Sequence, residues 1–181
     1  MKKFLPAIFV VVFFAVVLVA QMSLNGQKSS ASRVELSKEK HIFYQGLYSK
    51  AKFSTIDNKT YNLKDQEKSI VIINFWASWC KPCLAEFKTL NQFVKKYGDK
   101  VLVLGINNDD VDADKLIKKT KDKYELSFDI VKDEKGIIAS TYDINTVPFT
   151  IVFHKGKVLS IYNRENNFMS SEFTDLIESK L

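Results

Sequence analysis

A run of mostly β-branched and aromatic residues, SIVIINFW from Ser69 to Trp76, ends four residues before the first of the chain's only two cysteines. An apolar stretch of this length is typical of a strand covered on both faces, as in the centre of an α/β sheet. After the cysteines, apolar residues recur at three- and four-residue steps until Gly98, which predicts an amphipathic helix. VLVLGIN at 101–107 predicts a second buried strand, and the order strand, helix, strand indicates a parallel βαβ unit.

The flanking patterns complete a mixed sheet. Residues 51–63 alternate apolar and polar around Asp57-Asn58-Lys59, which predicts a short hairpin at a sheet edge. Later patterns predict a helix over 112–124, a strand over 128–131, a brief helix or turn over 136–142, a strand pair over 149–154 and 158–162, and a helix over 170–181. We therefore expect an α/β fold with a central mixed sheet flanked by helices and an extra N-terminal β-hairpin.

The N-terminus has the features of an export signal. Two lysines precede a run without charge from Phe4 to Ala20, and bulky Leu18 stands where signal cleavage favours a small residue. We expect residues 1–22 to be an uncleaved membrane anchor, with a cleaved signal peptide as the alternative. The preceding lysines would keep the N-terminus in the cytoplasm, so the rest would face outward. A polar linker over 23–45 and a folded domain over 46–181 follow.

Composition excludes some classes of partner. The chain of 181 residues is 46% hydrophobic, enough for one domain with a substantial core, and its net charge is +6. The lysines are spread along the chain, without the stripe of arginines and aromatic residues that indicates a nucleic-acid surface. We expect no nucleic-acid partner and a monomeric protein.

The two cysteines, Cys80 and Cys83, are placed where a strand gives way to a helix. A separation of three residues at a helix start brings two sulfurs within disulfide reach. Cys80 should lie at the helix N-terminus, where such sites lower a thiol pKa from about 8.5 to roughly 3.5–7.5, whereas Cys83 should be shielded. Cys80 would then form the mixed disulfide with a partner and Cys83 would resolve it. Pro82 would stiffen the loop, and Lys81 would either favour the thiolate or simply face solvent.

The segment NFWASWCKPC, residues 74–83, resembles the active-site segment of the thioredoxin superfamily. It is most similar to the exported, membrane-tethered TlpA/ResA-type oxidoreductases that include the CcmG (DsbE) proteins, and the resemblance extends from about Phe53 to the C-terminus. It implies a thioredoxin-like fold. Asn74 matches the asparagine that this group has in place of the buried aspartate of thioredoxins. Glu86 matches its acidic residue near the buried thiol.

The resemblance also implies roles for these residues. Glu86 would exchange a proton with Cys83, since a carboxylate in an apolar pocket prefers to be protonated; a helix-dipole role is the alternative. Val147 and Pro148 resemble the cis-proline loop, where the residue before proline offers its backbone to an extended partner. Trp79 would cover the active site.

The implied function is an exported thiol-disulfide oxidoreductase that uses no cofactor. We expect it to reduce disulfides of specific extracytoplasmic proteins, with apocytochrome c as one candidate client, and to receive electrons from a membrane thiol protein. A DsbA-like oxidase or an isomerase remains open.

Other roles for the cysteine pair are less well supported by the sequence. A structural disulfide over so short a loop would stabilise little. A copper-handling factor could combine the thiols with His41 or His154, but neither histidine has a spacing relation to them. Peroxide reduction is disfavoured because Ala77 stands where a threonine would be expected.

Overall fold

The computed structural model describes residues 16–17 and 38–181, and the chain divides into two units, of which the second, Phe43–Leu181, is compact. The predicted membrane anchor lies outside the described residues except for 16–17, which are helical, and the first part of the predicted linker lies outside them entirely. Within the described residues, no helix is long and apolar enough to cross a membrane.

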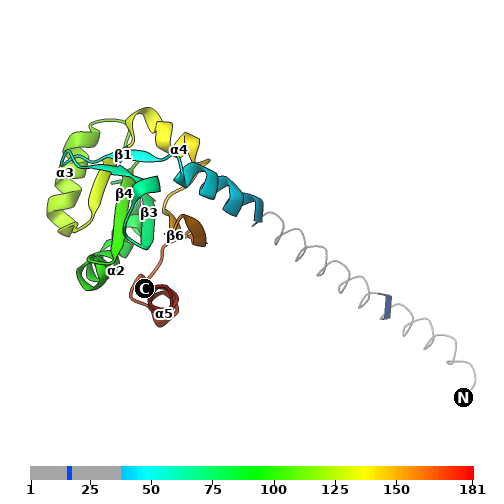
Figure 1. Ribbon diagram of the computed structural model, residues 1–181. Coiled ribbons are helices and arrows are strands. Elements are labelled where there is room, and N and C mark those ends of the chain that lie inside the picture. Colours follow the sequence, from blue (N-terminus) through cyan, green and yellow to red (C-terminus); the bar gives the residue numbers. More distant parts are fainter. Residues whose placement is uncertain (1–15, 18–37) are drawn as a thin grey trace, which may run out of the picture. The chain divides into compact units, whose positions relative to one another are not determined.

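The second unit is built on a five-stranded mixed sheet with the order β5-β4-β3-β6-β7 (Figure 1). Its strands are β3 (Ile70–Trp76), β4 (Val101–Asn107), β5 (Asp129–Lys132), β6 (Phe149–His154) and β7 (Lys157–Tyr162). The central strand β3 runs parallel to β4 and antiparallel to β6. The predicted mixed sheet and parallel βαβ unit are therefore confirmed.

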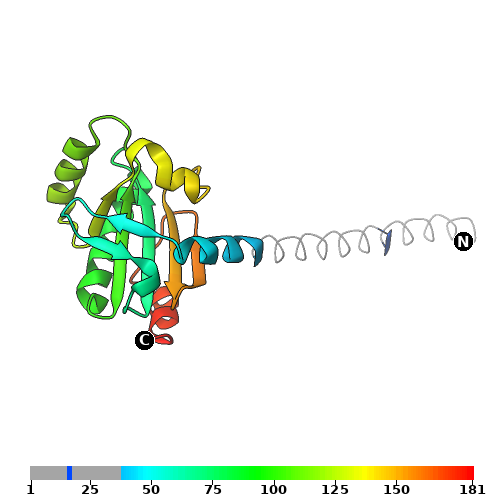
Figure 2. The same ribbon diagram turned by 45° about the horizontal axis from the view of Figure 1, so that its top comes forward.

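Helices cover both faces of this sheet (Figure 2). They are α2 (Lys81–Tyr97), α3 (Ala113–Tyr124), α4 (Ile137–Thr141) and α5 (Ser171–Glu178), with short 3-10 turns at Leu63–Asp65 and Glu134–Gly136. The α2-side cluster contains apolar side chains of α2, α3 and α5, and the hairpin-side cluster contains those of α4 and the N-terminal hairpin. The four predicted helices are present.

The sequence of β3 explains why it is central. Alternate residues enter opposite clusters: Ile70, Ile72 and Trp76 face α2, whereas Val71, Ile73 and Phe75 face the hairpin. All seven residues of the strand are buried. A strand that is apolar on both faces is stable only between two layers, and this arrangement places the end of β3, where the cysteines follow, next to a rigid core.

The N-terminal hairpin covers the β5 edge of the sheet. Its strands β1 (Lys52–Ser54) and β2 (Thr60–Asn62) pair antiparallel, as predicted. Asn58 adopts a φ of 61° in the turn, a left-handed conformation that asparagine tolerates better than most residues. The Ile56 N–H donates to the Ile130 carbonyl at 2.9 Å, so the loop of this separate two-stranded sheet is hydrogen-bonded to the edge strand β5.

The domain begins earlier than the sequence predicts. Residues 38–48 are helical, and the compact unit starts at Phe43 rather than at residue 46. Tyr44 and Tyr48 are buried in the hairpin-side cluster. The Gln45 side chain accepts a hydrogen bond from the Val158 N–H of β7 at 3.2 Å. The end of the predicted linker is therefore part of the core.

Helix α2 ends at Gly98, as predicted, but for a different reason. Gly98 has a φ of −56°, so the left-handed conformation that commonly favours glycine at a helix end is absent there. A Cβ atom at this position would lie 2.6 Å from the Val94 carbonyl oxygen. The close approach of the backbone explains the glycine.

Candidate active site

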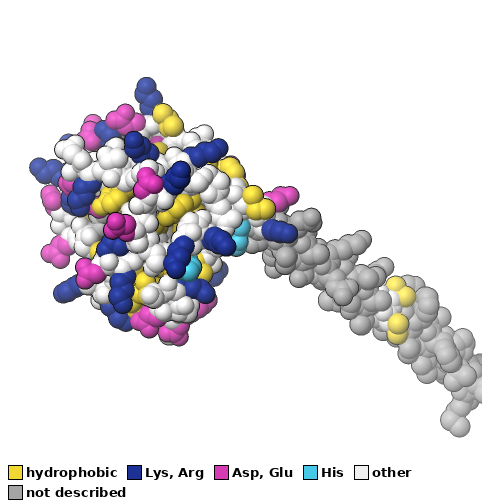
Figure 3. Space-filling view, in the orientation of Figure 1, with side chains coloured by type: hydrophobic (Ala, Val, Ile, Leu, Met, Phe, Trp, Pro, Cys, Tyr) yellow, Lys and Arg dark blue, Asp and Glu magenta, His cyan; other side chains and the backbone are white. Residues whose placement is uncertain are grey.

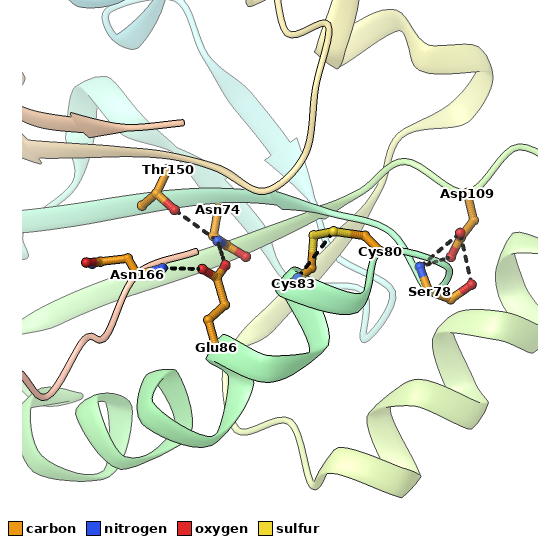
Figure 4. The surroundings of a disulfide bond; sticks show 8 residues. All are labelled: Asn74, Ser78, Cys80, Cys83, Glu86, Asp109, Thr150 and Asn166. Carbon is orange, nitrogen blue, oxygen red and sulfur yellow. Dashed lines mark hydrogen bonds between the residues drawn. A yellow bond between two sulfur atoms is a disulfide. The ribbon is translucent and has the colours of Figure 1, made fainter. Parts of the chain in front are cut away.

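Cys80 and Cys83 form a disulfide at the start of α2 (Figure 4). Their sulfurs are 2.07 Å apart and their Cα atoms 5.3 Å apart. Cys80 is the N-cap of α2, and its Sγ accepts a hydrogen bond from the Cys83 N–H at 3.2 Å. The same backbone N–H would stabilise a thiolate at Cys80 once the disulfide opens, because the first amides of a helix lack intrahelical partners.

The two cysteines differ in their surroundings. Cys83 is fully buried, and Cys80 is 4% exposed. Their neighbours Lys81 and Pro82 occupy the first helical positions and are exposed. Cys80 is thus slightly nearer the surface than Cys83. Lys81 and Pro82 follow it at the start of the helix, as the sequence indicates.

The two tryptophans of the segment lie in opposite environments. Trp76 is fully buried in the α2-side cluster, whereas 69% of Trp79 is exposed. An exposed side chain of this size directly before Cys80 provides an apolar surface beside the disulfide. The predicted role of Trp79 as a cover for the active site would therefore be filled by a side chain that is largely exposed to solvent.

Glu86 is a buried carboxylate on α2, three residues after Cys83. It is 1% exposed, and its two oxygens accept hydrogen bonds from Asn74 Nδ2 at 2.7 Å and the Asn166 N–H at 3.1 Å (Figure 4). Burial raises the pKa of Glu86 to about 7, because it disfavours the charged form; the two hydrogen bonds act in the opposite direction, and Glu165 adds to the increase. Glu86 can therefore gain or lose a proton near neutral pH.

Asn74 joins Glu86 to the sheet. It lies in the middle of β3 with its side chain on the α2 side, and Nδ2 also donates to Thr150 Oγ1 on β6 at 3.0 Å. The same amide therefore spans the central strand pair and the active-site helix.

A second buried carboxylate, Asp109, holds the loop that leads to Cys80. Its oxygens accept hydrogen bonds from the Ser78 N–H at 3.0 and 3.2 Å, from Ser78 Oγ at 3.0 Å and from Asn107 Nδ2 at 2.8 Å. Asp109 is 4% exposed and follows the carboxyl end of β4. Asp109 is not among the site residues predicted from the sequence, although polar residues directly after a buried parallel strand are a general signal of a site.

The proline loop lies at the same end of the sheet as the cysteines. The bond between Val147 and Pro148 is cis. Because Phe75 pairs with Phe149 in antiparallel register, Pro148 follows on opposite Trp76, at the end of β3. Pro148 is buried, and Val147 is half-buried against both core clusters.

His154 does not join this site. It pairs with Ile70 at the beginning of β3, which is the opposite end of the strand from the cysteines. His41 belongs to the other unit of the chain. Within residues 16–17 and 38–181, no group of three or more His, Cys, Asp or Glu side chains is placed to hold a metal ion.

Charged side chains do not gather into a single patch on the face of the folded unit drawn in Figure 3. Lysines and arginines there are interspersed with acidic side chains. This distribution agrees with the solvated surface that the sequence indicates.

The mixed sheet, the cysteine pair at the start of a helix and the facing cis-proline loop define a thioredoxin-like protein. Residues 48–161 match the AhpC/TSA family, and the chain belongs to that family. Its similarity to ResA proteins identifies it as a thiol-disulfide oxidoreductase of the ResA type.

Two relatives are similar to the chain in sequence, and one solved structure shares its fold. The thioredoxin-like protein YneN of Bacillus subtilis is 34% identical over 60% of this chain, and the chain covers 64% of YneN, slightly under two thirds. The thiol-disulfide oxidoreductase ResA of Bacillus cereus is 31% identical over 75% of this chain and 73% of that protein. A secreted Mycobacterium tuberculosis disulfide oxidoreductase homologous to Escherichia coli DsbE has the same fold, with a TM-score of 0.60, 21% identity, and coverage of 73% of this chain and 97% of that one.

Proposed function

We propose that the protein reduces disulfides of specific extracytoplasmic proteins through a cycle in which Cys80 and Cys83 alternate between dithiol and disulfide. The observation that carries the proposal is the pairing of an N-cap cysteine with a buried carboxylate: Cys80 Sγ faces the Cys83 N–H, and Glu86 lies one helical turn further along α2.

The first step uses the position of Cys80. Its thiolate, stabilised by the helix N-terminus, attacks one sulfur of the client disulfide. A bond forms between Cys80 and that sulfur, the client disulfide breaks, and the second client sulfur leaves as a thiolate that takes up a proton from solvent.

The second step uses two buried residues, Glu86 and Cys83. The Glu86 carboxylate accepts the thiol proton of Cys83, as its pKa of about 7 allows. The resulting Cys83 thiolate attacks the Cys80 sulfur, the bond between Cys80 and the client breaks, and the enzyme disulfide forms. The client sulfur that was bound to Cys80 leaves as a thiolate and takes up a proton from solvent, so both client sulfurs are then reduced. Glu86 then releases the proton to solvent.

A client segment would bind beside the proline loop. Val147, before the cis bond, would offer its backbone in strand-like pairing, and Pro148 has no N–H that could compete for the sulfurs. Exposed Trp79 would contact the client on the other side of Cys80.

The N-terminal sequence and the family resemblance support a proposal for the location and the partners. We expect the apolar segment over 1–22 to tether the domain outside the cytoplasm, and a membrane thiol protein to return the enzyme disulfide to the dithiol form. Apocytochrome c, whose haem-attachment cysteines must be reduced, is the proposed client.

The test is electron transfer to a defined disulfide. The reduced protein is mixed with an oxidised Cys-x-x-Cys-His peptide, and thiols are quantified by alkylation and mass spectrometry. Release of reduced peptide together with the Cys80–Cys83 disulfide supports the proposal. A Cys83→Ser variant should stop at the mixed disulfide with the peptide. Absence of peptide reduction by the wild-type protein would contradict it.

A second candidate is a disulfide oxidase, because an N-cap position that stabilises the Cys80 thiolate also stabilises the reduced enzyme. The two directions are separated by the equilibrium of the protein with a defined glutathione buffer. An equilibrium that keeps the enzyme oxidised under conditions that reduce the peptide favours the reductase, and the reverse order favours the oxidase.

A further inference from the structure

The nitrogen of the Asn74 side-chain amide makes hydrogen bonds, whereas its oxygen makes none with the residues that the structure describes. Its nitrogen donates to Glu86 Oε1 at 2.7 Å and to Thr150 Oγ1 at 3.0 Å, which uses both of its hydrogens. Its oxygen is buried, and among residues 38–181 no donor lies within hydrogen-bonding distance of it. A buried polar atom without a partner is costly and rare in native proteins.

The two donor contacts fix the direction of the unpaired oxygen. Turning the amide by 180° would place Asn74 Oδ1 against the carboxylate oxygen of Glu86, which is repulsive while Glu86 is ionised. The oxygen must therefore point away from both acceptors. Figure 4 shows it on the side of the amide that faces Cys83.

Cys83 changes its hydrogen-bonding capacity when the disulfide opens. In the disulfide its sulfur carries no hydrogen, and the thiol formed on reduction has one hydrogen to donate. Cys83 is fully buried, so the thiol must find its acceptor inside the protein. The unpaired acceptor on the neighbouring strand and the new donor on α2 are complementary.

We propose that Asn74 is a positioning residue that accepts the thiol hydrogen of Cys83 in the reduced protein while it holds the Glu86 carboxylate with its other end. The proposal rests on the proposed function and adds to it a source of redox tuning. When the disulfide takes up two electrons and two protons from a dithiol partner, the S–S bond breaks and one proton remains on Cys83. That proton is held by Asn74 Oδ1 beside Glu86, its later acceptor.

This arrangement has a consequence for the equilibrium between the two redox forms. The disulfide form contains the unpaired amide oxygen, and the dithiol form satisfies it. Asn74 therefore favours the dithiol form. Replacing it with leucine, which has a similar shape and no polar atoms, should remove that bias.

The spectroscopic test uses the fact that the chain has only two cysteines. In a Cys80→Ser variant of the full chain, the S–H stretching band in the Raman spectrum belongs to Cys83 alone. A hydrogen-bonded thiol gives a lower frequency than an unbonded one. The band should move to higher frequency when Asn74→Leu is added and should stay in place when Thr150→Val is added, because Thr150 contacts only the amide nitrogen. No movement with Asn74→Leu would overturn the proposal.

The thermodynamic test uses the wild-type cysteines. The equilibrium constant for reduction by glutathione should fall by about threefold to tenfold in Asn74→Leu, as expected from the loss of one buried hydrogen bond, and by less than about twofold in Thr150→Val. Equal effects of the two variants would indicate a general packing role and overturn the assignment.

A measurement on the unmodified chain covers the case in which Asn74→Leu does not fold. The side-chain carbonyl carbon of Asn74 should shift downfield in the NMR spectrum on reduction, because it gains a hydrogen bond, and an unchanged shift would contradict the proposal. Failure to reduce a client peptide, with the Raman and NMR shifts present, would overturn the reductase assignment alone.

Discussion

Two buried carboxylates lie on either side of the active-site disulfide and serve it differently (Figure 4). Both are almost inaccessible, with Glu86 1% and Asp109 4% exposed. Asp109 accepts hydrogen bonds from three groups, two of them in Ser78, within the loop before Cys80. Glu86 accepts from two groups, on β3 and on the segment after β7, and has a third acid, Glu165, nearby.

The comparison shows that burial alone does not determine what a carboxylate does. Asp109 is a fixed acceptor that joins the loop to the end of β4. Glu86 accepts hydrogen bonds from two groups, compared with three for Asp109, and burial raises the pKa of Glu86 to about 7. A proton can therefore move on and off Glu86 under ordinary conditions. In the proposed mechanism, Asp109 fixes the geometry of the loop and Glu86 exchanges a proton with Cys83.

The largest expected effect is on the rate of thiol-disulfide exchange. Glu86→Gln should slow resolution of the mixed disulfide by about 100-fold, the lower end of what a positioned general base contributes. The dependence of that rate on pH around 7 should also disappear. Stopped-flow measurement of client release between pH 5 and 9 provides the check. Asp109→Asn is the matched control and should retain the dependence on pH.

The second prediction concerns the pH dependence of stability. The folded pKa of Glu86, about 7, is above its ordinary value of 4.5, so the folded state binds the proton more tightly. Its contribution is fully present below pH 4.5 and is lost as pH rises to about 7, a decrease of about 3 kcal/mol. Urea unfolding of the oxidised protein should show this decrease in wild type and a flatter profile in Glu86→Gln. A wild-type profile that stays level over this range would contradict the shift.

The third prediction concerns the other carboxylate. Asp109→Asn should lower the free energy of unfolding by about 1–3 kcal/mol, because the new amide cannot accept all the hydrogen bonds that Ser78 and Asn107 donate. Asp110→Asn, a change at an exposed neighbour, should have little effect. Equal losses in the two variants would show that Asp109 does not act through its contacts.

The elements that could be predicted from the sequence are those with a local pattern. The apolar run of β3 and the three- and four-residue steps of α2 both lie within single segments, and their strand and helix are present. The helix over 38–48 was missed because few of its residues are buried, with Tyr44 and Tyr48 the main ones. A polar segment with two aromatic anchors resembles a linker until the sheet that it packs against is known.

The site was predictable in part for the same reason. Cys80, Cys83 and Glu86 lie within seven consecutive residues of one motif. The Asp109 contact with Ser78 spans 31 residues, and the Asn166 contact with Glu86 spans 80. Such pairs depend on strand order and on the path of the chain after β7, which no local spacing specifies.

The smallest expected effect separates the two contacts that Ser78 makes with Asp109. Ser78→Ala removes the hydroxyl bond at 3.0 Å but keeps both backbone N–H contacts, so it should cost only about 0.5–1.5 kcal/mol in unfolding free energy. In a double-mutant cycle with Asp109→Asn the two losses should be less than additive, because the second change removes part of the same interaction. Additive losses would mean that Ser78 and Asp109 stabilise the loop independently, and the contrast with Glu86 would then rest on Asn107 and the backbone of the loop.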